Sequence, residues 1–131
     1  VSLLAALIAP QRFKQLLFVG ASPRYLNDPT TGYIGGFEQA DLDALYAAMS
    51  ANYYAWASGF APLAMGNPER PELAIEFAKT LSAIRPDIAQ AIARVIFQSD
   101  HRADLAKLTV PVVILQSTND IAVPPQVGQY M

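Results

Sequence analysis

The chain has 131 residues, which is enough for one domain with a modest hydrophobic core. Hydrophobic residues make up 53% of it and charged residues 15%, and the net charge of −2 with scattered basic residues argues against a nucleic-acid partner. The absence of cysteine excludes disulfides, thiolate catalysis and zinc–thiolate sites, and it is typical of a cytoplasmic protein.

The first 36 residues predict a helix, a strand and a loop. The apolar opening VSLLAALIAP has a helical pattern but is too short to span a bilayer, so we expect no membrane association. It starts without Met and without a helix cap, so we expect the chain to be part of a longer protein. Leu16 to Val19 is a short aliphatic run closed by Gly20, which is typical of a fully buried parallel strand. Residues 21–36 are rich in proline and glycine and predict a loop.

Between Phe37 and Phe97 the pattern predicts helices only. Four amphipathic segments follow one another and should form two helical hairpins, with Pro62 ending the second helix. The apolar stripes consist of Leu42, Leu45, Tyr46 and Met49; Tyr53, Trp56, Ala57 and Phe60; Leu73, Phe77, Leu81 and Ile84; and Ile88, Ile92, Val95 and Ile96.

The last part of the chain returns to an alternation of helix and strand. The segment SDHRADLAKLTVP predicts a short helix, and Val112 to Leu115 form a second aliphatic strand. A further helix begins near Pro124, and the sequence stops about one turn into it. Strands that alternate with helices indicate a parallel sheet of the α/β class.

This order divides the chain into three segments. Residues 1–36 and 99–131 are core α/β segments, and residues 37–98 are a helical insertion between them. The insertion follows a strand, so we expect it at the sheet edge to which the carboxyl ends of the strands point. Ligands bind at that edge in open α/β folds.

The loop after the second strand, QSTNDIAVP, carries one carboxylate, Asp120. An acid just past the carboxyl end of a parallel strand can orient a histidine, provided that it stays ionised and accepts a hydrogen bond from the imidazole. An aspartate in this position also commonly forms an Asx turn, and the spacing alone favours that simpler interpretation.

Five motifs in order resemble the α/β-hydrolases of the RsbQ type, which include the plant karrikin and strigolactone receptor hydrolases. The motifs are SPRYLND, GGFEQ, NYYAWASGFAPLA, IFQSDHRADL and VPVVILQSTNDIAVP, and the resemblance extends from Leu3 to Met131. It implies a fragment of an α/β-hydrolase parallel sheet with an inserted four-helix lid. It also implies a Ser–Asp–His triad in which Asp120 is the acid. The serine should precede Val1 and the histidine should follow Met131, so we expect the 131 residues alone to be inactive.

Two residues could replace the missing members of the triad. No glycine flanks Ser2, which lies inside a helical pattern instead of a sharp nucleophile turn. His101 precedes Asp120, whereas the histidine of this family follows the acid. We interpret both residues as structural.

The resemblance further implies an apolar pocket beneath the lid for a small lipophilic ligand. The matching positions are Tyr25, Phe37, Leu45, Trp56, Phe60, Phe97 and Ala122. From the residues alone, aromatic stripes at helical spacing are typical of a core. None of these positions is Lys or Arg, which favours a neutral hydrophobic substrate over an anionic one.

Two functions fit these observations. The first is a serine hydrolase acting on a small hydrophobic ester or lactone, with the stress-signalling role in sigma factor regulation that RsbQ-type proteins have. The second is a receptor that binds a hydrophobic ligand under its lid and recruits a protein partner through the lid. The resemblance implies no cofactor and no metal. A helical interaction module without chemistry is disfavoured, because two buried strands would then have no use.

Overall fold

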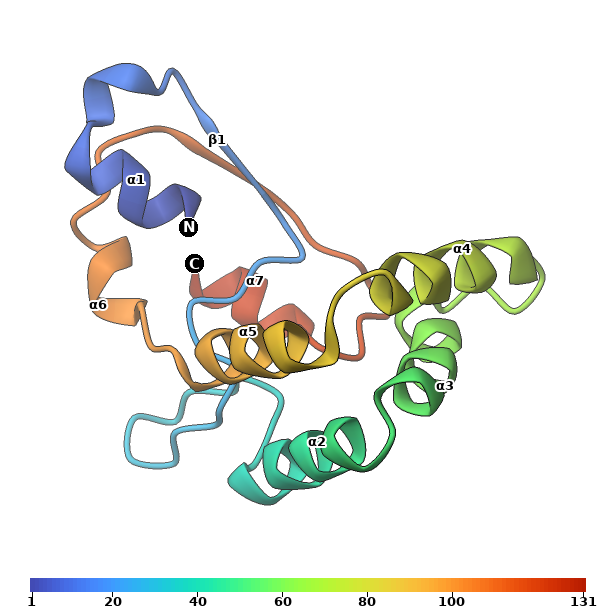
Figure 1. Cartoon of the computed structure of the whole chain (residues 1–131). Coiled ribbons are helices and arrows are strands. Elements are labelled where there is room, and N and C mark those ends of the chain that lie inside the picture. The colour runs from blue at the N-terminus through green and yellow to red at the C-terminus, as the bar shows by residue number, and fades with distance from the viewer.

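The computed structural model describes all 131 residues, which fold into a small α/β core and a helical extension (Figure 1). We call the extension, which consists of α2 to α5, the helical arm. The elements in chain order are α1 (Ser2–Ile8), η1 (Pro10–Arg12), β1 (Leu16–Val19), α2 (Gln39–Ala51), α3 (Tyr53–Met65), α4 (Pro71–Ser82), α5 (Pro86–Gln98), α6 (Arg102–Leu105), β2 (Val112–Leu115) and α7 (Pro125–Tyr130).

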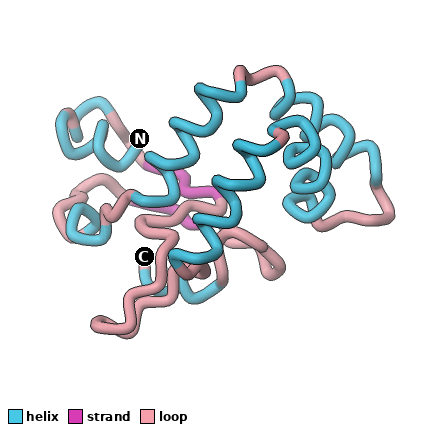
Figure 2. The backbone as a smooth tube through the Cα atoms, turned by 60° about the horizontal axis from the view of Figure 1, so that its bottom comes forward, coloured by secondary structure: helices cyan, strands magenta, loops and turns pink.

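The two strands pair in parallel, which confirms the predicted sheet. Leu16 lies opposite Val112, although the whole helical arm separates the two strands along the chain. In Figure 2 the strands lie side by side, and the long helices extend away from them. The carboxyl ends of β1 and β2 therefore meet at one edge, which is the edge from which the chain enters the arm.

Only one face of this sheet is covered. Leu16 and Phe18 are buried and pack with residues of α1 and with Val110. The side chains on the other face are 40% to 66% exposed; they are Leu17, Val19, Val113 and Leu115. The prediction of fully buried strands is therefore wrong for one face, because no element of these 131 residues packs against it.

Local sequence signals set the ends of the arm helices. Asp41 accepts a hydrogen bond from the Glu38 backbone N–H at 2.8 Å and forms a capping box at the start of α2. Asn52 caps α3 through the Ala55 N–H. The prediction that Pro62 ends this helix is wrong, because α3 continues to Met65. Proline removes only its own N–H bond, and the turn that would receive it lies at the exposed surface.

The helix stops one turn later at Gly66. This residue has a φ of 58°, a left-handed conformation that favours glycine, and its N–H closes the last turn on the Pro62 carbonyl.

The arm is held together by a cluster of buried side chains between α2, α3 and α5. The apolar stripes predicted for α2 and α3 supply most of it, while the stripe of α4 is only partly buried. The members of the cluster are Leu42, Tyr46, Met49, Tyr53 and Ala93.

The α5 stripe differs from the prediction. Its isoleucines and valine are 42% to 72% exposed, and Ala93 is the residue that α5 buries. The reason is that α5 packs on the cluster through the small side chains of Ala89 and Ala93, which leaves Ile92 and Ile96 beside this contact and partly exposed.

Two buried tyrosines of this cluster differ in their hydrogen bonds. The Tyr53 hydroxyl donates to the Leu81 carbonyl oxygen at 2.9 Å, whereas the Tyr46 hydroxyl is buried without a partner. We therefore expect Tyr46→Phe to leave the free energy of unfolding unchanged or to raise it by up to about 1 kcal/mol, and Tyr53→Phe to lower it by about 1 kcal/mol. Urea denaturation of the full-length protein measures both. A loss at Tyr46 equal to that at Tyr53 would contradict the expectation.

A network of ion pairs joins the two stretches of chain that connect the core to the arm. The Arg102 guanidinium pairs with Asp28 at 2.9 Å and with Asp100 at 2.8 Å, and Arg24 pairs with Asp100 at 2.6 Å. Hydrogen bonds from Thr30 and Arg102 lower the pKa of Asp28, and Arg102 lowers the pKa of Asp100. Both carboxylates are therefore more acidic in the folded protein than in the unfolded chain.

We expect Arg102→Met to lower the Tm of the full-length protein by about 5 °C at pH 7, because it leaves two partly buried carboxylates without their cation. Because the pKa values of both carboxylates are lower in the folded protein, the ion pairs stabilise the fold at a pH above about 3.9, the pKa of aspartate in the unfolded chain. This stabilisation is lost as the pH falls below that value. The difference in Tm between wild type and variant should therefore shrink below about pH 4. Arg85→Met, which removes an exposed local pair, is the control. A difference in Tm that does not depend on pH would contradict this account.

Candidate functional site

Asp120 lies in the loop just past β2, beside the carboxyl end of β1. Its Oδ1 atom accepts backbone N–H bonds from Ala122 at 2.9 Å and from Val123 at 3.0 Å, so the Asx turn that the sequence predicts is present. Its Oδ2 atom has no hydrogen-bond partner and faces Gly20, where an added Cβ atom would lie 3.3 Å away. The turn therefore fixes the carboxylate while one oxygen stays free to accept an N–H bond.

Gly20 makes this arrangement possible. Its φ of 51° suits glycine, and the missing side chain leaves room beside the free oxygen of Asp120. The ends of the two strands thus form one site: the loop after β2 supplies the Asp120 carboxylate, and Gly20 at the end of β1 leaves space beside it.

Tyr25 connects this location to the helical arm. Burial raises the pKa of the Tyr25 phenol, and the charges of Asp120 and Tyr33 raise it further. The ring centroid of Tyr25 lies 4.9 Å from that of Phe97 and 6.4 Å from that of Phe37. Three predicted residues, two from the loop before α2 and one from the end of α5, therefore form one aromatic cluster, and Tyr25 is the member near the acid.

The loop before α2 also contacts the acid loop directly. Gly36 has a φ of 110°, and a Cβ atom there would lie 2.9 Å from the Pro124 Cδ atom. Ala122, another predicted position, packs against the buried side chains of Tyr33 and Val123. The structure thus places Tyr25 and Ala122 near Asp120, and it places Phe37 and Phe97 against Tyr25.

The other predicted positions lie further along the arm. Trp56 stacks on Phe60 with ring centroids 5.1 Å apart, and Phe60 contacts Phe77 of α4. Leu45 packs against the buried cluster of the arm. Phe60 and Leu45 are half-buried but do not line the groove described next.

Between its helices the arm contains a groove of about 160 Å³ that is lined by hydrophobic residues only. Trp56 and Phe97 are predicted positions among them. The remaining lining residues were not predicted to line a pocket; they are Met49, Tyr53, Leu81, Ile84, Ala89, Ile92, Ala93 and Ile96. A signal for α5 was present, since its alanines and its isoleucines form an apolar surface wider than one helix contact requires.

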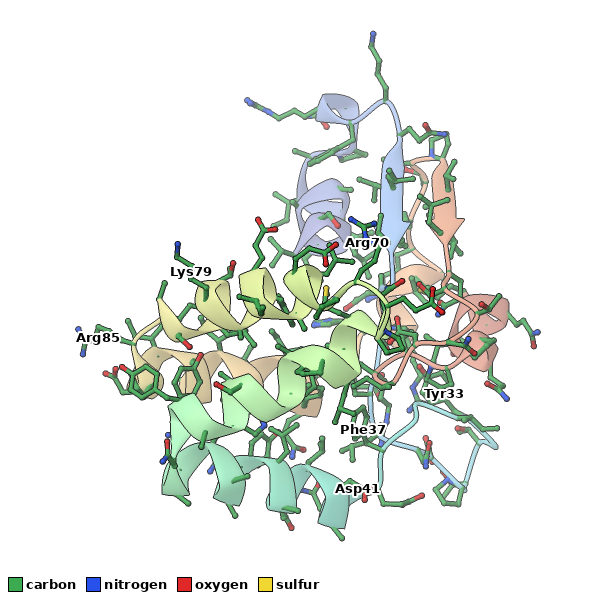
Figure 3. All side chains as sticks on the ribbon, turned by 90° about the vertical axis from the view of Figure 1, so that its right-hand side faces the viewer. Tyr33, Phe37, Asp41, Arg70, Lys79 and Arg85 are labelled. Carbon is green, nitrogen blue, oxygen red and sulfur yellow. The ribbon has the colours of Figure 1, made fainter.

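No Lys or Arg side chain lines this groove. The charged side chains of Lys79 and Arg85 point outward from the arm (Figure 3). An apolar groove with no Lys, Arg, His, Asp or Glu in its lining suits a neutral hydrophobic molecule.

The two alternative triad residues lie elsewhere. His101 pairs with Asp104, its Nδ1 atom lying 3.1 Å from the Asp104 Oδ2 atom, and it has no hydrogen bond to Asp120. Ser2 is exposed in the first turn of α1, between Val1 and Leu3. No group of three or more His, Cys, Asp or Glu side chains is placed to hold a metal ion. None of the helices combines the length and the apolar character needed to cross a membrane.

Curated proteins resemble the chain along its whole length. A probable esterase from Oryza sativa subsp. japonica is 50% identical and the karrikin insensitive 2 receptor CA from Petunia hybrida is 49% identical, each over 131 residues. A strigolactone esterase from Pisum sativum is 45% identical over 129 residues. Each match covers at least 98% of the chain and 48% of the relative. The chain thus spans about half the length of the curated relatives it matches.

A solved structure agrees with these relatives. The structure of a hydrolase from Oleispira antarctica superimposes with a TM-score of 0.91 at 35% sequence identity, and the match covers 98% of this chain and 47% of that one. No protein-family model matches the sequence.

Proposed function

We propose that this chain is part of a serine hydrolase that cleaves a small hydrophobic ester or lactone. The chain is homologous to the plant strigolactone and karrikin receptor hydrolases, and its fold is that of about half of an α/β hydrolase. One observation carries this proposal. The Asp120 carboxylate is fixed through Oδ1 at the carboxyl edge of the sheet, while Oδ2 is free beside Gly20.

In this reaction Asp120 acts on a histidine. Its free oxygen accepts the N–H bond of the imidazole, holds it in the tautomer that can take a proton, and stabilises the imidazolium that results. A serine hydroxyl loses its proton to that histidine and attacks the substrate carbonyl carbon. The histidine then protonates the departing alkoxide, and water hydrolyses the acyl-enzyme by the same route. We propose that the serine and the histidine come from parts of the protein outside these 131 residues.

The helical arm is the proposed lid, and its underside the proposed binding surface. The purely hydrophobic lining of the groove and the aromatic cluster at Tyr25, Phe37 and Phe97 support a neutral, apolar acyl or alkyl group as the bound part of the substrate. Because Ile92 and Ile96 line the groove, we propose that they also contact the bound part of the substrate.

A second function is supported by the relatives that are named receptors. In this proposal the ligand binds under the lid and the protein recruits a signalling partner, with the stress-signalling role of RsbQ-type proteins as one form. Two measurements on the full-length protein separate the functions: turnover of p-nitrophenyl acetate, and partner binding, each with and without Asp120→Asn. Acid-dependent turnover without a partner favours the enzyme. Partner binding that survives the substitution in a protein without turnover favours the receptor.

A further inference from the structure

Gln116 follows the last residue of β2 and spans the base of the acid loop. Its Nε2 atom donates a hydrogen bond to the Val123 carbonyl oxygen at 2.8 Å. This bond closes residues 117–122 into a loop whose two ends are joined by a side chain instead of a strand ladder. Asp120 is inside this closed loop.

Val123 transmits the restraint to the acid. It is 2% exposed, its carbonyl oxygen accepts the bond from Gln116, and its N–H donates to Asp120 Oδ1 at 3.0 Å. A shift of the Val123 backbone would therefore change the position of the Asp120 carboxylate. The side chain of Gln116 and the carboxylate are two hydrogen bonds apart.

The packing around Gln116 holds its side chain in place. A Cβ atom added at Gly128 of α7 would lie 3.2 Å from the Gln116 Oε1 atom, so the amide uses the space that this glycine leaves. The Oε1 atom itself is buried without a partner. A buried unpaired acceptor is unfavourable, and a methionine of similar length would avoid it. The bond from Nε2 is the contribution of this residue that methionine could not replace.

We infer that Gln116 is a positioning residue that holds the acid loop, and hence Asp120, in the orientation required by the histidine. The inference rests on the proposed function.

The test uses kinetics of the full-length protein with p-nitrophenyl acetate. Gln116→Met should lower kcat about ten-fold with little change in KM, because it affects the acid and not the substrate groove. A less well held carboxylate stabilises the imidazolium less, so the acidic limb of the pH profile should move to lower pH. Gln126→Met, at an exposed glutamine of α7 without hydrogen bonds from its side chain, is the matched control and should leave kcat unchanged.

A double-variant comparison separates positioning from a general loss of structure. In the Asp120→Asn background, Gln116→Met should cause no further loss of kcat, because the group it positions no longer functions. Gly128→Ala, which crowds the Gln116 amide without removing it, should lower kcat about three-fold and provides a second variant in case Gln116→Met folds poorly.

The inference is overturned if both Gln116→Met and Gly128→Ala keep wild-type kcat and pH profile while Asp120→Asn inactivates the enzyme, a result that leaves the proposed function intact. It is also overturned if Gln116→Met lowers kcat equally in both backgrounds. Full activity of Asp120→Asn would instead overturn the proposed function itself, and the inference with it.

Discussion

Asp120→Asn in the full-length protein should lower kcat for p-nitrophenyl acetate by about 10⁴-fold while the protein stays folded. Asparagine keeps an Oδ1 atom that accepts the N–H bonds of Ala122 and Val123, so the Asx turn is preserved. The other atom becomes an amide nitrogen, which donates hydrogen bonds and cannot accept one from the imidazole. The histidine of the proposed triad would then lose the group that selects its tautomer.

The matched control for this substitution is Asp43→Asn. Asp43 is exposed on α2, and its carboxylate bonds only to the Gln39 side chain. This variant should keep the wild-type kcat. A kcat of Asp120→Asn within about ten-fold of the wild type would show that the carboxylate is not part of a triad.

Ile96→Glu should raise the KM for 1-naphthyl acetate by about 30-fold, with little change in kcat. Ile96 lines the groove of the arm, where every lining residue is hydrophobic, so a carboxylate there would face an apolar ligand without a polar partner. Because the Ile96 side chain is 42% exposed in this chain, the substitution should not unfold the arm.

The neighbouring Val95→Glu is the control. Val95 is 72% exposed on the same helix and does not line the groove, while the change in helix propensity is similar. Its KM should stay close to that of the wild type. Equal increases in KM for the two variants would show that the groove is not where the substrate binds.

The sequence predicts the α/β core well because its signals are local. The strands occur over the predicted residues, since two aliphatic runs are each bounded by glycine, proline or polar residues. The parallel pairing follows from the helices between the strands. Pro62 shows the limit of such signals, because one missing N–H bond at an exposed helix turn is too small a loss to end α3.

The candidate site is predictable only in part. The position of Asp120 after a strand indicates both an Asx turn and a triad acid. The structure shows the Asx turn through one oxygen and leaves the other without a hydrogen bond, so the two roles are compatible and the triad role is a proposal. Gln116 gives no signal in the sequence, because a glutamine after a strand is usually a surface residue and its partner Val123 is defined by loop closure. The groove depends on which face α5 turns to α2, and periodicity alone did not distinguish Ala93 from Ile96.

The ion pairs around Arg102 have a mechanical consequence for access to the groove. They join the chain segment before α2 to the segment after α5, so the two connections between core and arm are bonded to each other. This double connection resists rotation of the whole arm relative to the strands. The junction of α2 and α3 is the single residue Asn52, which forms hydrogen bonds with both helices. We therefore expect a ligand to reach the groove without the arm lifting away from the strands.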